Sequence, residues 1–321
     1  MLPHRPLPPE LPAAFTVAEA HRLGVGRGRL RGSDLERPFH GVRARGTTGV
    51  STSDPADDLR TDLRRLAQAY ATRMQPLEFF SHRTAATLWE IPLPALSDVV
   101  LDVSVPRPGR APRSVGVRGH QAHPRLVRVT DHNGFKLSSP ASTWASLGPM
   151  LHPYDLVAAG DAIVCRRASA GGNGFSRAPL ATVDQLRAAV DAGRRPGVGA
   201  LQDALGRIRP GSWSRLETWV RLILVDAGLP EPALNYDAYD DAGNFLGCID
   251  LAYPELKIAI EYEGAHHWRT AEQFHRDIDR LNRLVEAGWR IVRLTGSHVF
   301  STPSEVVRRV TVARAQCGAT A

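Results

Sequence analysis

Cysteine, lysine and long apolar runs are all scarce in this 321-residue chain. The three cysteines, Cys165, Cys248 and Cys317, lie far apart and in no metal-type spacing, so the pattern excludes a disulfide framework. The longest apolar run, near residues 222–225, is far shorter than the roughly 20 residues that a membrane helix needs. The N-terminus is broken by prolines and lacks the apolar core of a signal peptide. We therefore expect a cytoplasmic protein with reduced thiols and no membrane partner.

Lysine occurs only at Lys136 and Lys257, so arginine supplies nearly all of the positive charge behind the net charge of +7. Residues 211–321 carry 12 basic and 15 acidic residues, whereas the first 210 residues carry 28 and 18. A basic N-terminal part joined to a mildly acidic C-terminal part is typical of a polyanion binder attached to a metal-binding module. An arginine-rich codon bias is the alternative explanation for the same charge.

The chain is too long for one ordinary hydrophobic core, and its pattern of helices, strands and glycine-rich connectors predicts several domains. We expect four segments, which are a winged-helix-like DNA-binding region at 1–75, a mixed α/β region at 76–168, a linker with a helix at 169–210 and a last domain at 211–321.

The first segment has the spacing of a helix-turn-helix or winged helix. Thr16 and Glu19 form a capping-box pattern at the start of one short helix, which Gly24 ends. A second short helix is expected from Gly26 to about Leu35, and residues 37–46 are expected to form the wing. The candidate nucleic-acid contacts on the second helix are Arg27, Arg29 and Arg31.

The last segment reads as α-β-β-β-α-β-α and carries an acidic hairpin. Side chains alternate along a strand, so Ile258 and Ile260 face one side and Glu261 the other. A turn near Pro254 places Asp250 opposite Glu261 or one step diagonal to it, where two carboxylates lie about 5–8 Å apart. That spacing suits one hard cation such as Mg²⁺, with Mn²⁺ as a substitute.

This segment resembles the PD-(D/E)XK nuclease superfamily, and more narrowly its very-short-patch-repair-type endonucleases. The resemblance covers about a third of the chain, from residue 212 to residue 310. The matching elements are "EYEGAHHW" and "QFHRDIDRLNRLVEAGWRIVRLT", with Glu261, Glu263, Gly264, His267, Asp277, Arg280, Gly288 and Arg293 at the family's spaced positions.

The resemblance implies a metal-dependent phosphodiesterase with five candidate catalytic residues, Glu217, Asp250, Glu261, Glu263 and His267. Asp250 and Glu261 would bind the metal, and Glu217 would orient the metal or its water. His267 would act as the acid or base, or face the phosphate. Arg280 would bind a phosphate.

Simpler structural roles compete with several of these assignments. Glu217 is the third residue of the helix that Ser214 opens, which is the capping-box position. Asp277 and Arg280 are spaced as an ordinary i,i+3 helix pair. Glu263 occupies the superfamily's lysine position, and Lys257 lies too far along the strand to replace that lysine, so a loss of activity stays open.

The N-terminal part resembles the AbiEi-type antitoxin and transcriptional regulator family, through "FTVAEAHRLGV", "SHRTAATLW" and "KLSSPASTWASL". This resemblance implies DNA binding. Two further histidine patterns have no assigned chemistry. His120 and His123 face opposite sides of an extended segment with no acidic partner expected nearby, and Ser81 with His82 is interpreted as a helix cap.

We expect an α/β multidomain protein with an N-terminal winged helix, a mixed α/β middle region and a C-terminal restriction-endonuclease-like α-β-β-β-α-β domain. The function that follows is a Mg²⁺-dependent DNA endonuclease. The alternative is a non-cleaving DNA-binding regulator or antitoxin on a degenerate nuclease fold. The sequence leaves open whether the substrate is DNA or RNA and which sequence or structure is cleaved. It also leaves open whether the protein is a homodimer and whether it has a toxin–antitoxin or defence partner.

Overall fold

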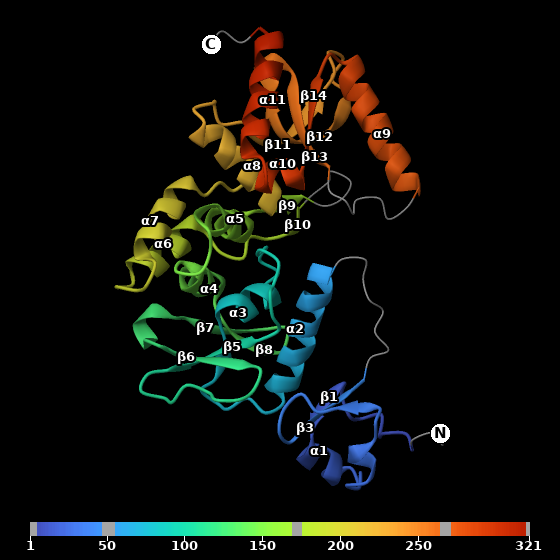
Figure 1. The fold of residues 1–321 in the computed structure, drawn as a ribbon, viewed down its shortest axis with the longest axis vertical. Helices are drawn as coiled ribbons and strands as arrows, with labels where there is room; N and C mark the ends of the chain where they lie inside the picture. Colours follow the sequence, from blue (N-terminus) through green and yellow to red (C-terminus); the bar gives the residue numbers. More distant parts are fainter. Residues whose placement is uncertain (1–4, 47–54, 169–174, 264–270, 319–321) are drawn as a thin grey trace. The chain divides into compact units, whose positions relative to one another are not determined.

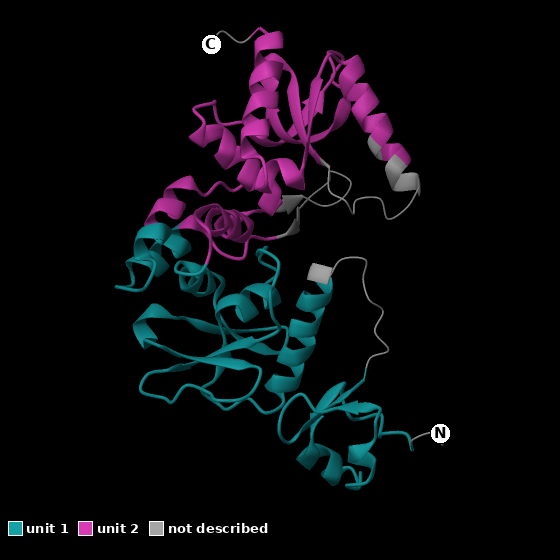
Figure 2. Ribbon diagram, in the orientation of Figure 1, with its two compact units in different colours: residues 1–150, 184–201 teal, residues 151–183, 202–321 magenta. Residues whose placement is uncertain are grey.

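The structure is a computed structural model that describes residues 5–46, 55–168, 175–263 and 271–318 (Figure 1). Helices alternate with antiparallel and mixed sheets, so the predicted α/β class is confirmed. The chain forms two compact units, unit 1 with residues 1–150 and 184–201, and unit 2 with residues 151–183 and 202–321 (Figure 2). No helix in the described part of the chain combines the length and the apolarity that crossing a bilayer requires.

Unit 1 begins with a small three-stranded sheet in the order β1-β3-β2 (Ala14–Thr16, Val42–Arg45 and Leu35–Glu36). Helix α1 (Val17–Arg22) starts at the predicted capping box, in which Glu19 N–H donates to Thr16 Oγ1 at 3.1 Å.

The predicted second helix from Gly26 to Leu35 is wrong, because only a 3-10 turn, η1 (Arg29–Arg31), forms there. Glycines at positions 26, 28 and 32 lower the helix propensity of this stretch by about 1 kcal/mol each relative to alanine.

The rest of unit 1 is built on a five-stranded sheet in the order β6-β5-β4-β8-β7. Its strands are β4 (Phe79–Phe80), β5 (Leu101–Pro106), β6 (Val117–Ala122), β7 (Val129–His132) and β8 (Phe135–Ser138). The helices that accompany this sheet are α2 (Pro55–Ala71), α3 (His82–Leu88) and α4 (Pro140–Leu147), and η2 (Pro124–Leu126) follows β6. Asn133 and Gly134 both have positive φ, as a tight turn between antiparallel β7 and β8 requires.

The segment predicted as a linker with one helix contains two. Helix α6 (Val183–Asp191) is the predicted one, and α7 (Val198–Arg207) was not expected. Residues 184–201 belong to unit 1, and unit 2 resumes at residue 202.

Unit 2 opens with α5 (Pro153–Val164) and the short strands β9 (Arg167–Ala168) and β10 (Phe175–Arg177). The predicted α-β-β-β-α-β-α order follows. Its seven elements are α8 (Arg215–Asp226), β11 (Ala233–Tyr239), β12 (Phe245–Tyr253), β13 (Ile258–Glu263), α9 (Ala271–Glu286), β14 (Arg290–Thr295) and α11 (Pro303–Gln316). Two short elements were not part of the predicted order, η3 (Pro254–Leu256) between β12 and β13 and α10 (Gly296–Phe300) between β14 and α11. The four strands lie in the order β11-β12-β13-β14, with β14 parallel to β13 and the other neighbours antiparallel.

Helices cover both faces of this sheet. Ile258 and Ile260 pack in one apolar cluster with side chains of α8 and α11, whereas Ala259 packs in a second cluster with Leu284 of α9. The predicted alternation of β13 is therefore confirmed. Each buried large aliphatic side chain contributes about 1.5–3 kcal/mol to folding, so the two clusters fix the register of the hairpin.

Helix α5 is joined to α8 through a buried ion pair. Arg221 Nη2 lies 2.9 Å from Asp161 Oδ2, and each side chain is 1 % exposed. Asp161 also accepts hydrogen bonds from Arg209 N–H at 2.7 Å and Thr218 Oγ1 at 2.8 Å. Such a network holds the first helix of the sheet domain in one orientation, because removal of one partner would leave a buried charge.

Candidate active site

The predicted acidic pair lies on neighbouring strands. Leu251 of β12 pairs with Ile260 of β13, so the next positions along the ladder, Asp250 and Glu261, face each other. Asp250 Oδ2 accepts a hydrogen bond from the backbone N–H of Tyr262 at 3.3 Å. The turn η3 sets this register, as the sequence pattern predicted.

Glu261 already has a cationic partner, which is Arg280 of α9. Arg280 Nη1 and Nη2 donate to the two carboxylate oxygens at 2.9 and 2.8 Å, and Nη1 also donates to the Cys248 carbonyl at 3.0 Å. The Glu261 side chain is 9 % exposed and that of Arg280 is 23 % exposed. This two-pronged pair is strong and geometrically specific. The sequence predicted Arg280 as a phosphate contact and did not predict this pair.

A glycine makes room for this arginine. Gly247 of β12 has φ +151°, and a Cβ built on it would lie 2.8 Å from both Cγ and Cδ of Arg280. Any other residue would therefore displace the arginine stem from its path across the strand.

Glu217 is the third acidic group of the site and is 6 % exposed. Its Oε2 accepts hydrogen bonds from Trp213 N–H at 2.7 Å and Asn235 Nδ2 at 3.0 Å, while its own N–H donates to the Ser214 cap at 3.1 Å. The predicted cap is therefore present. Both of these bonds to the carboxylate reach Oε2.

The electrostatics of the site reflect crowded carboxylates. Burial, and next the charges of Glu261 and Glu217, raise the pKa of Asp250 to about 7. Burial also raises the pKa of Glu217, against the hydrogen bond from Trp213 N–H. Arg280 lowers the pKa of Asp250, but burial and the two neighbouring carboxylates outweigh that effect, so a divalent cation at this site would stabilise the ionised form of Asp250.

Several predicted positions fall where the structure gives no side chain. Gly264 and His267 lie outside the described residues. Glu263 is described only as the last residue of β13, where it pairs with Thr295, and Asp277 only as a residue of α9. Arg293 lies on the predicted fourth strand, β14, where it pairs with Glu261 of β13.

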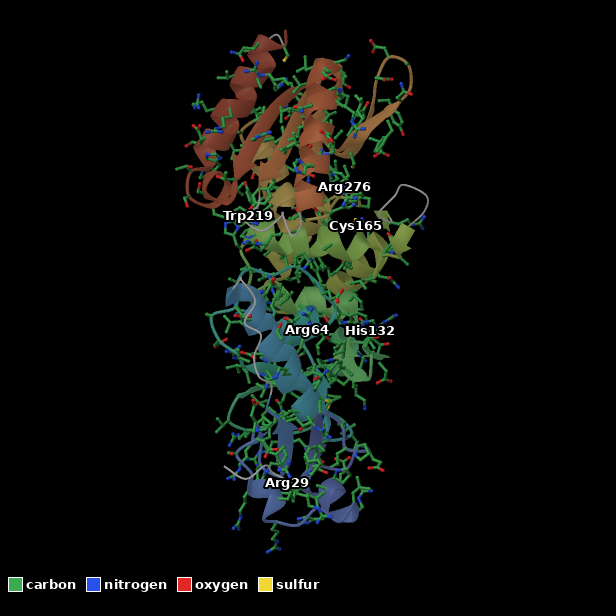
Figure 3. The ribbon with its side chains drawn as sticks, turned by 90° about the vertical axis from the view of Figure 1, so that its right-hand side faces the viewer. Arg29, Arg64, His132, Cys165, Trp219 and Arg276 are labelled. Atoms are coloured by element: carbon green, nitrogen blue, oxygen red, sulfur yellow. The ribbon has the colours of Figure 1, made fainter. Side chains whose placement is uncertain are left out.

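The predicted nucleic-acid contacts of unit 1 differ in their surroundings. Arg27 and Arg31 are exposed and form no ion pair with a described residue. Arg29, labelled in Figure 3, instead binds Asp34 through two bonds of 2.9 and 2.6 Å, and its side chain is 13 % exposed. Arg27 and Arg31 can therefore meet a phosphate directly, whereas Arg29 is held within unit 1.

One cluster in unit 1 was missed. In the part of the chain that the structure describes, a single group of His, Cys, Asp and Glu places three ligand atoms within 4.8 Å of one another, and it consists of His82, Asp102 and His120. His120 was expected to lack an acidic partner, which is wrong, because its Nε2 lies 2.8 Å from Asp102 Oδ1. The one feature of the sequence that could have indicated this cluster is Asp102, a lone aspartate in the apolar strand "VLDVSV".

Comparison with known proteins assigns no function. No protein-family model matches the chain. Two similar proteins are the uncharacterized proteins MT2308 and Rv2248 of Mycobacterium tuberculosis, from strains CDC 1551 / Oshkosh and ATCC 25618 / H37Rv. Each is 31% identical over 118 residues, which are 37% of this chain and 43% of the relative. The chain thus spans less than half the length of the curated relatives that it matches.

Proposed function

We propose that unit 2 is a Mg²⁺-dependent phosphodiester hydrolase that cleaves DNA in the cytoplasm, with Mn²⁺ as a substitute cation. The observation that carries the proposal is the facing pair of carboxylates on β12 and β13, with the buried carboxylate of Glu217 close enough to raise the pKa of Asp250. The resemblance of this hairpin and of α9 to very-short-patch-repair-type endonucleases agrees with that chemistry.

The donor set fits a hard divalent cation. Asp250 and Glu261 offer oxygen ligands, which Mg²⁺ prefers, and two carboxylates leave positions for water and phosphate. Glu261 can bind a cation while it is paired with Arg280. A carboxylate has about four lone-pair sites, and the arginine uses one on each oxygen. When bound, Mg²⁺ would supply polarisation of the phosphate and a more acidic water.

The chain's own groups would divide the remaining work. Glu217, whose carboxylate is held in place by Trp213 N–H and Asn235 Nδ2, would orient a water near Asp250. Arg280 would keep Glu261 oriented and would limit the negative charge that the DNA backbone meets. His267 remains the proposed proton donor or acceptor. The exposed Arg27 and Arg31 of unit 1 would bind backbone phosphates.

A second candidate function has its own observation. The paired Arg280 guanidinium satisfies Glu261 without any metal, and Glu263 stands where a lysine is usual. These features favour a DNA-binding regulator or antitoxin that keeps the fold without cleavage.

Supercoiled plasmid and linear duplex distinguish the two functions. The full chain is incubated with each in Mg²⁺, in Mn²⁺ or in EDTA, beside Asp250→Asn, Glu261→Gln and the control Glu255→Gln. Glu255 is an exposed carboxylate on η3, at the other end of the same hairpin. The proposal expects metal-dependent nicking by the wild type and the control alone. Equal inertness of all four proteins, with a retained gel shift of DNA, would favour the regulator instead.

A further inference from the structure

The register of two parallel strands brings polar side chains together in unit 1. Asp102 of β5 pairs with Arg118 of β6, and Ser104 pairs with His120. Residues two apart on a strand share a face, so all four side chains lie on one side of the sheet. On that side His120 Nε2 meets Asp102 Oδ1 at 2.8 Å.

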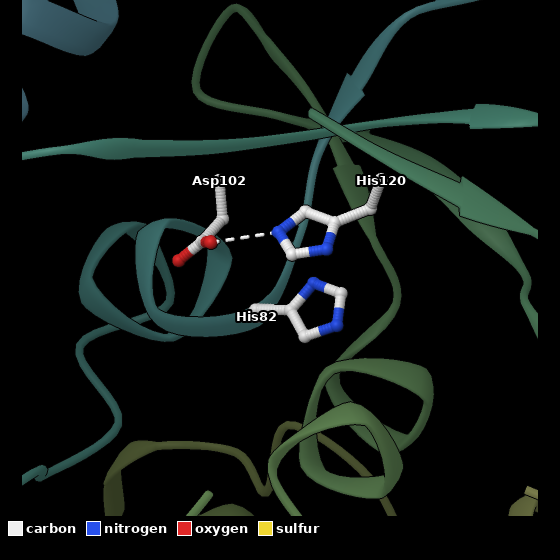
Figure 4. Close-up of side chains that lie close together, drawn as sticks. All are labelled: His82, Asp102 and His120. Carbon is white, nitrogen blue, oxygen red and sulfur yellow. Dashed lines mark hydrogen bonds and ion pairs between the residues drawn. The ribbon is translucent and has the colours of Figure 1, made fainter. Parts of the chain in front are cut away.

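His82 enters the same place from the start of α3. Its φ of +47° is the left-handed conformation that few residues other than glycine adopt, and its ring stacks on His120 with centroids 4.0 Å apart (Figure 4). The preceding residue is tied to β5, because Ser81 N–H donates to the Asp102 carbonyl at 3.0 Å. Backbone geometry therefore holds the imidazole beside the carboxylate.

Asp102 is a buried carboxylate whose hydrogen bonding is incomplete among the described residues. It is 0 % exposed, and its Oδ2 accepts no hydrogen bond from any described residue. Arg118 reaches only Oδ1, at 3.4 Å, and its side chain is 43 % exposed and shared with Asp98 at 3.7 Å. Buried polar atoms are normally paired, so Oδ2 is free to accept a further ligand.

We propose that His82, Asp102 and His120 bind a divalent cation of the zinc class, through one ring nitrogen of each histidine and the Asp102 carboxylate. Two imidazoles and one carboxylate form a donor set that Zn²⁺ accepts and that Mg²⁺, which prefers oxygen, does not. Three protein ligands leave the fourth position of a tetrahedral ion open, as in catalytic rather than structural zinc sites.

The surrounding groups support this geometry. Ser81 Oγ lies 2.9 Å from Nδ1 of His82 and 2.7 Å from Ser104 Oγ, and a bond of this kind fixes the ring and tautomer of a ligating histidine. The stacked rings turn on binding so that both lone pairs meet one ion. The His120 side chain is 24 % exposed, which leaves it room to turn, and the exposed Arg118 moves away from the arriving charge.

The test is a calorimetric titration of Zn²⁺ into the full chain, made without a histidine tag, stripped with a chelator and kept in excess Mg²⁺. Three variants remove one ligand each, namely His82→Asn, Asp102→Asn and His120→Gln. Asparagine suits position 82 because it tolerates positive φ better than most residues. His123→Gln is the matched control, since His123 is exposed just beyond β6 and lies outside the cluster.

The proposal expects one Zn²⁺ site in the wild type and in the control. Each ligand variant should lower the Zn²⁺ affinity by more than about 100-fold, which exceeds the loss typical of changes to residues that only contact a metal ligand. Cobalt replacing zinc should give visible absorption bands that vanish in the same three variants. Circular dichroism selects the variants that fold, and any one of the three suffices. A Zn²⁺ stoichiometry that folded ligand variants retain, or that His123→Gln also loses, would overturn the assignment.

Discussion

Arg280 holds Glu261 by two parallel hydrogen bonds of 2.9 and 2.8 Å, so the carboxylate expected to bind metal is already bound to a guanidinium. We predict that Arg280→Ala lowers the free energy of unfolding of unit 2 by about 1–3 kcal/mol, a range below that of a fully buried pair because Arg280 is partly exposed. Hydrogen exchange of β12 and β13 amides measures this. Arg276→Ala, an exposed arginine on the same helix (Figure 3), should change exchange little.

The same variant tests how the arginine and a metal relate. If Arg280 competes for Glu261, Mn²⁺ should bind Arg280→Ala more tightly than the wild type in a calorimetric titration. A weaker affinity would mean that the arginine instead orients the carboxylate for the metal.

Gly247 should be intolerant of any side chain. Gly247→Ala is expected to cost about 1–3 kcal/mol of unfolding free energy, because its Cβ would overlap the Arg280 stem and its φ is positive. Gly243→Ala is the control, since it has φ +83° and open space around it, and should cost only about 1 kcal/mol. In an Arg280→Ala background the cost of Gly247→Ala should fall to that of the control, and an undiminished cost would exclude the overlap as its cause.

Asp250 should make the metal-free protein less stable as the pH rises. Its pKa is raised from an ordinary 3.8 to about 7, so the folded state binds the proton more tightly than the unfolded state does. The resulting stabilisation is complete below pH 3.8 and is lost as the pH rises to about 7. The Asp250→Asn side chain cannot titrate. In EDTA its free energy of unfolding should therefore exceed that of the wild type by on the order of 2 kcal/mol at pH 8, and by less at pH 5. Urea unfolding followed by exchange of β12 amides at both pH values tests the sign.

Removing one partner of the buried Asp161–Arg221 pair should destabilise unit 2 strongly, and the effects of removing both partners should not add. Arg221→Met should cost about 3–5 kcal/mol, because Asp161 would keep a buried charge without its partner. Adding Asp161→Asn should recover part of that loss, and a double-mutant cycle of urea denaturation measures the coupling. Arg209→Met, whose side chain is 42 % exposed and pairs with Glu231, should cost less than about 1 kcal/mol.

The arginines of unit 1 should separate into two classes. Arg27→Ala and Arg31→Ala are each expected to weaken DNA binding to a similar extent on all sequences and to lower the salt dependence of log K by about 1. Arg29→Ala should mainly destabilise unit 1, since the two bonds between Arg29 and Asp34 are lost. Fluorescence anisotropy over a salt series distinguishes the classes, and an unchanged slope for Arg27→Ala and Arg31→Ala would remove them from the interface.

Local signals made much of the fold predictable. The caps Thr16 and Ser214, and the positive-φ glycine Gly24, mark helix ends that the structure confirms. The α-β-β-β-α-β-α order and the facing of Asp250 and Glu261 followed from alternation and one turn. These features depend on neighbours in sequence, which is why one sequence suffices for them.

Features set by tertiary packing were not predictable. The Arg280–Glu261 pair depends on how α9 lies across β12 and on a glycine under the arginine stem. The cluster of His82, Asp102 and His120 unites a helix start with two parallel strands, and no spacing along the chain records that register. The prediction of a second helix in unit 1 was wrong because the glycines in that stretch lower its helix propensity.

The interleaved boundaries of the two units have a practical consequence for dissecting the protein. The chain passes from one unit to the other three times, after residues 150, 183 and 201. A fragment cut at residue 211 would therefore lose Asp161 while keeping the Arg221 that it neutralises. Transplanting the sheet domain into another protein requires residues 151–183 to travel with it, and a single protease nick at one crossing would leave at least one unit in two separate pieces of chain.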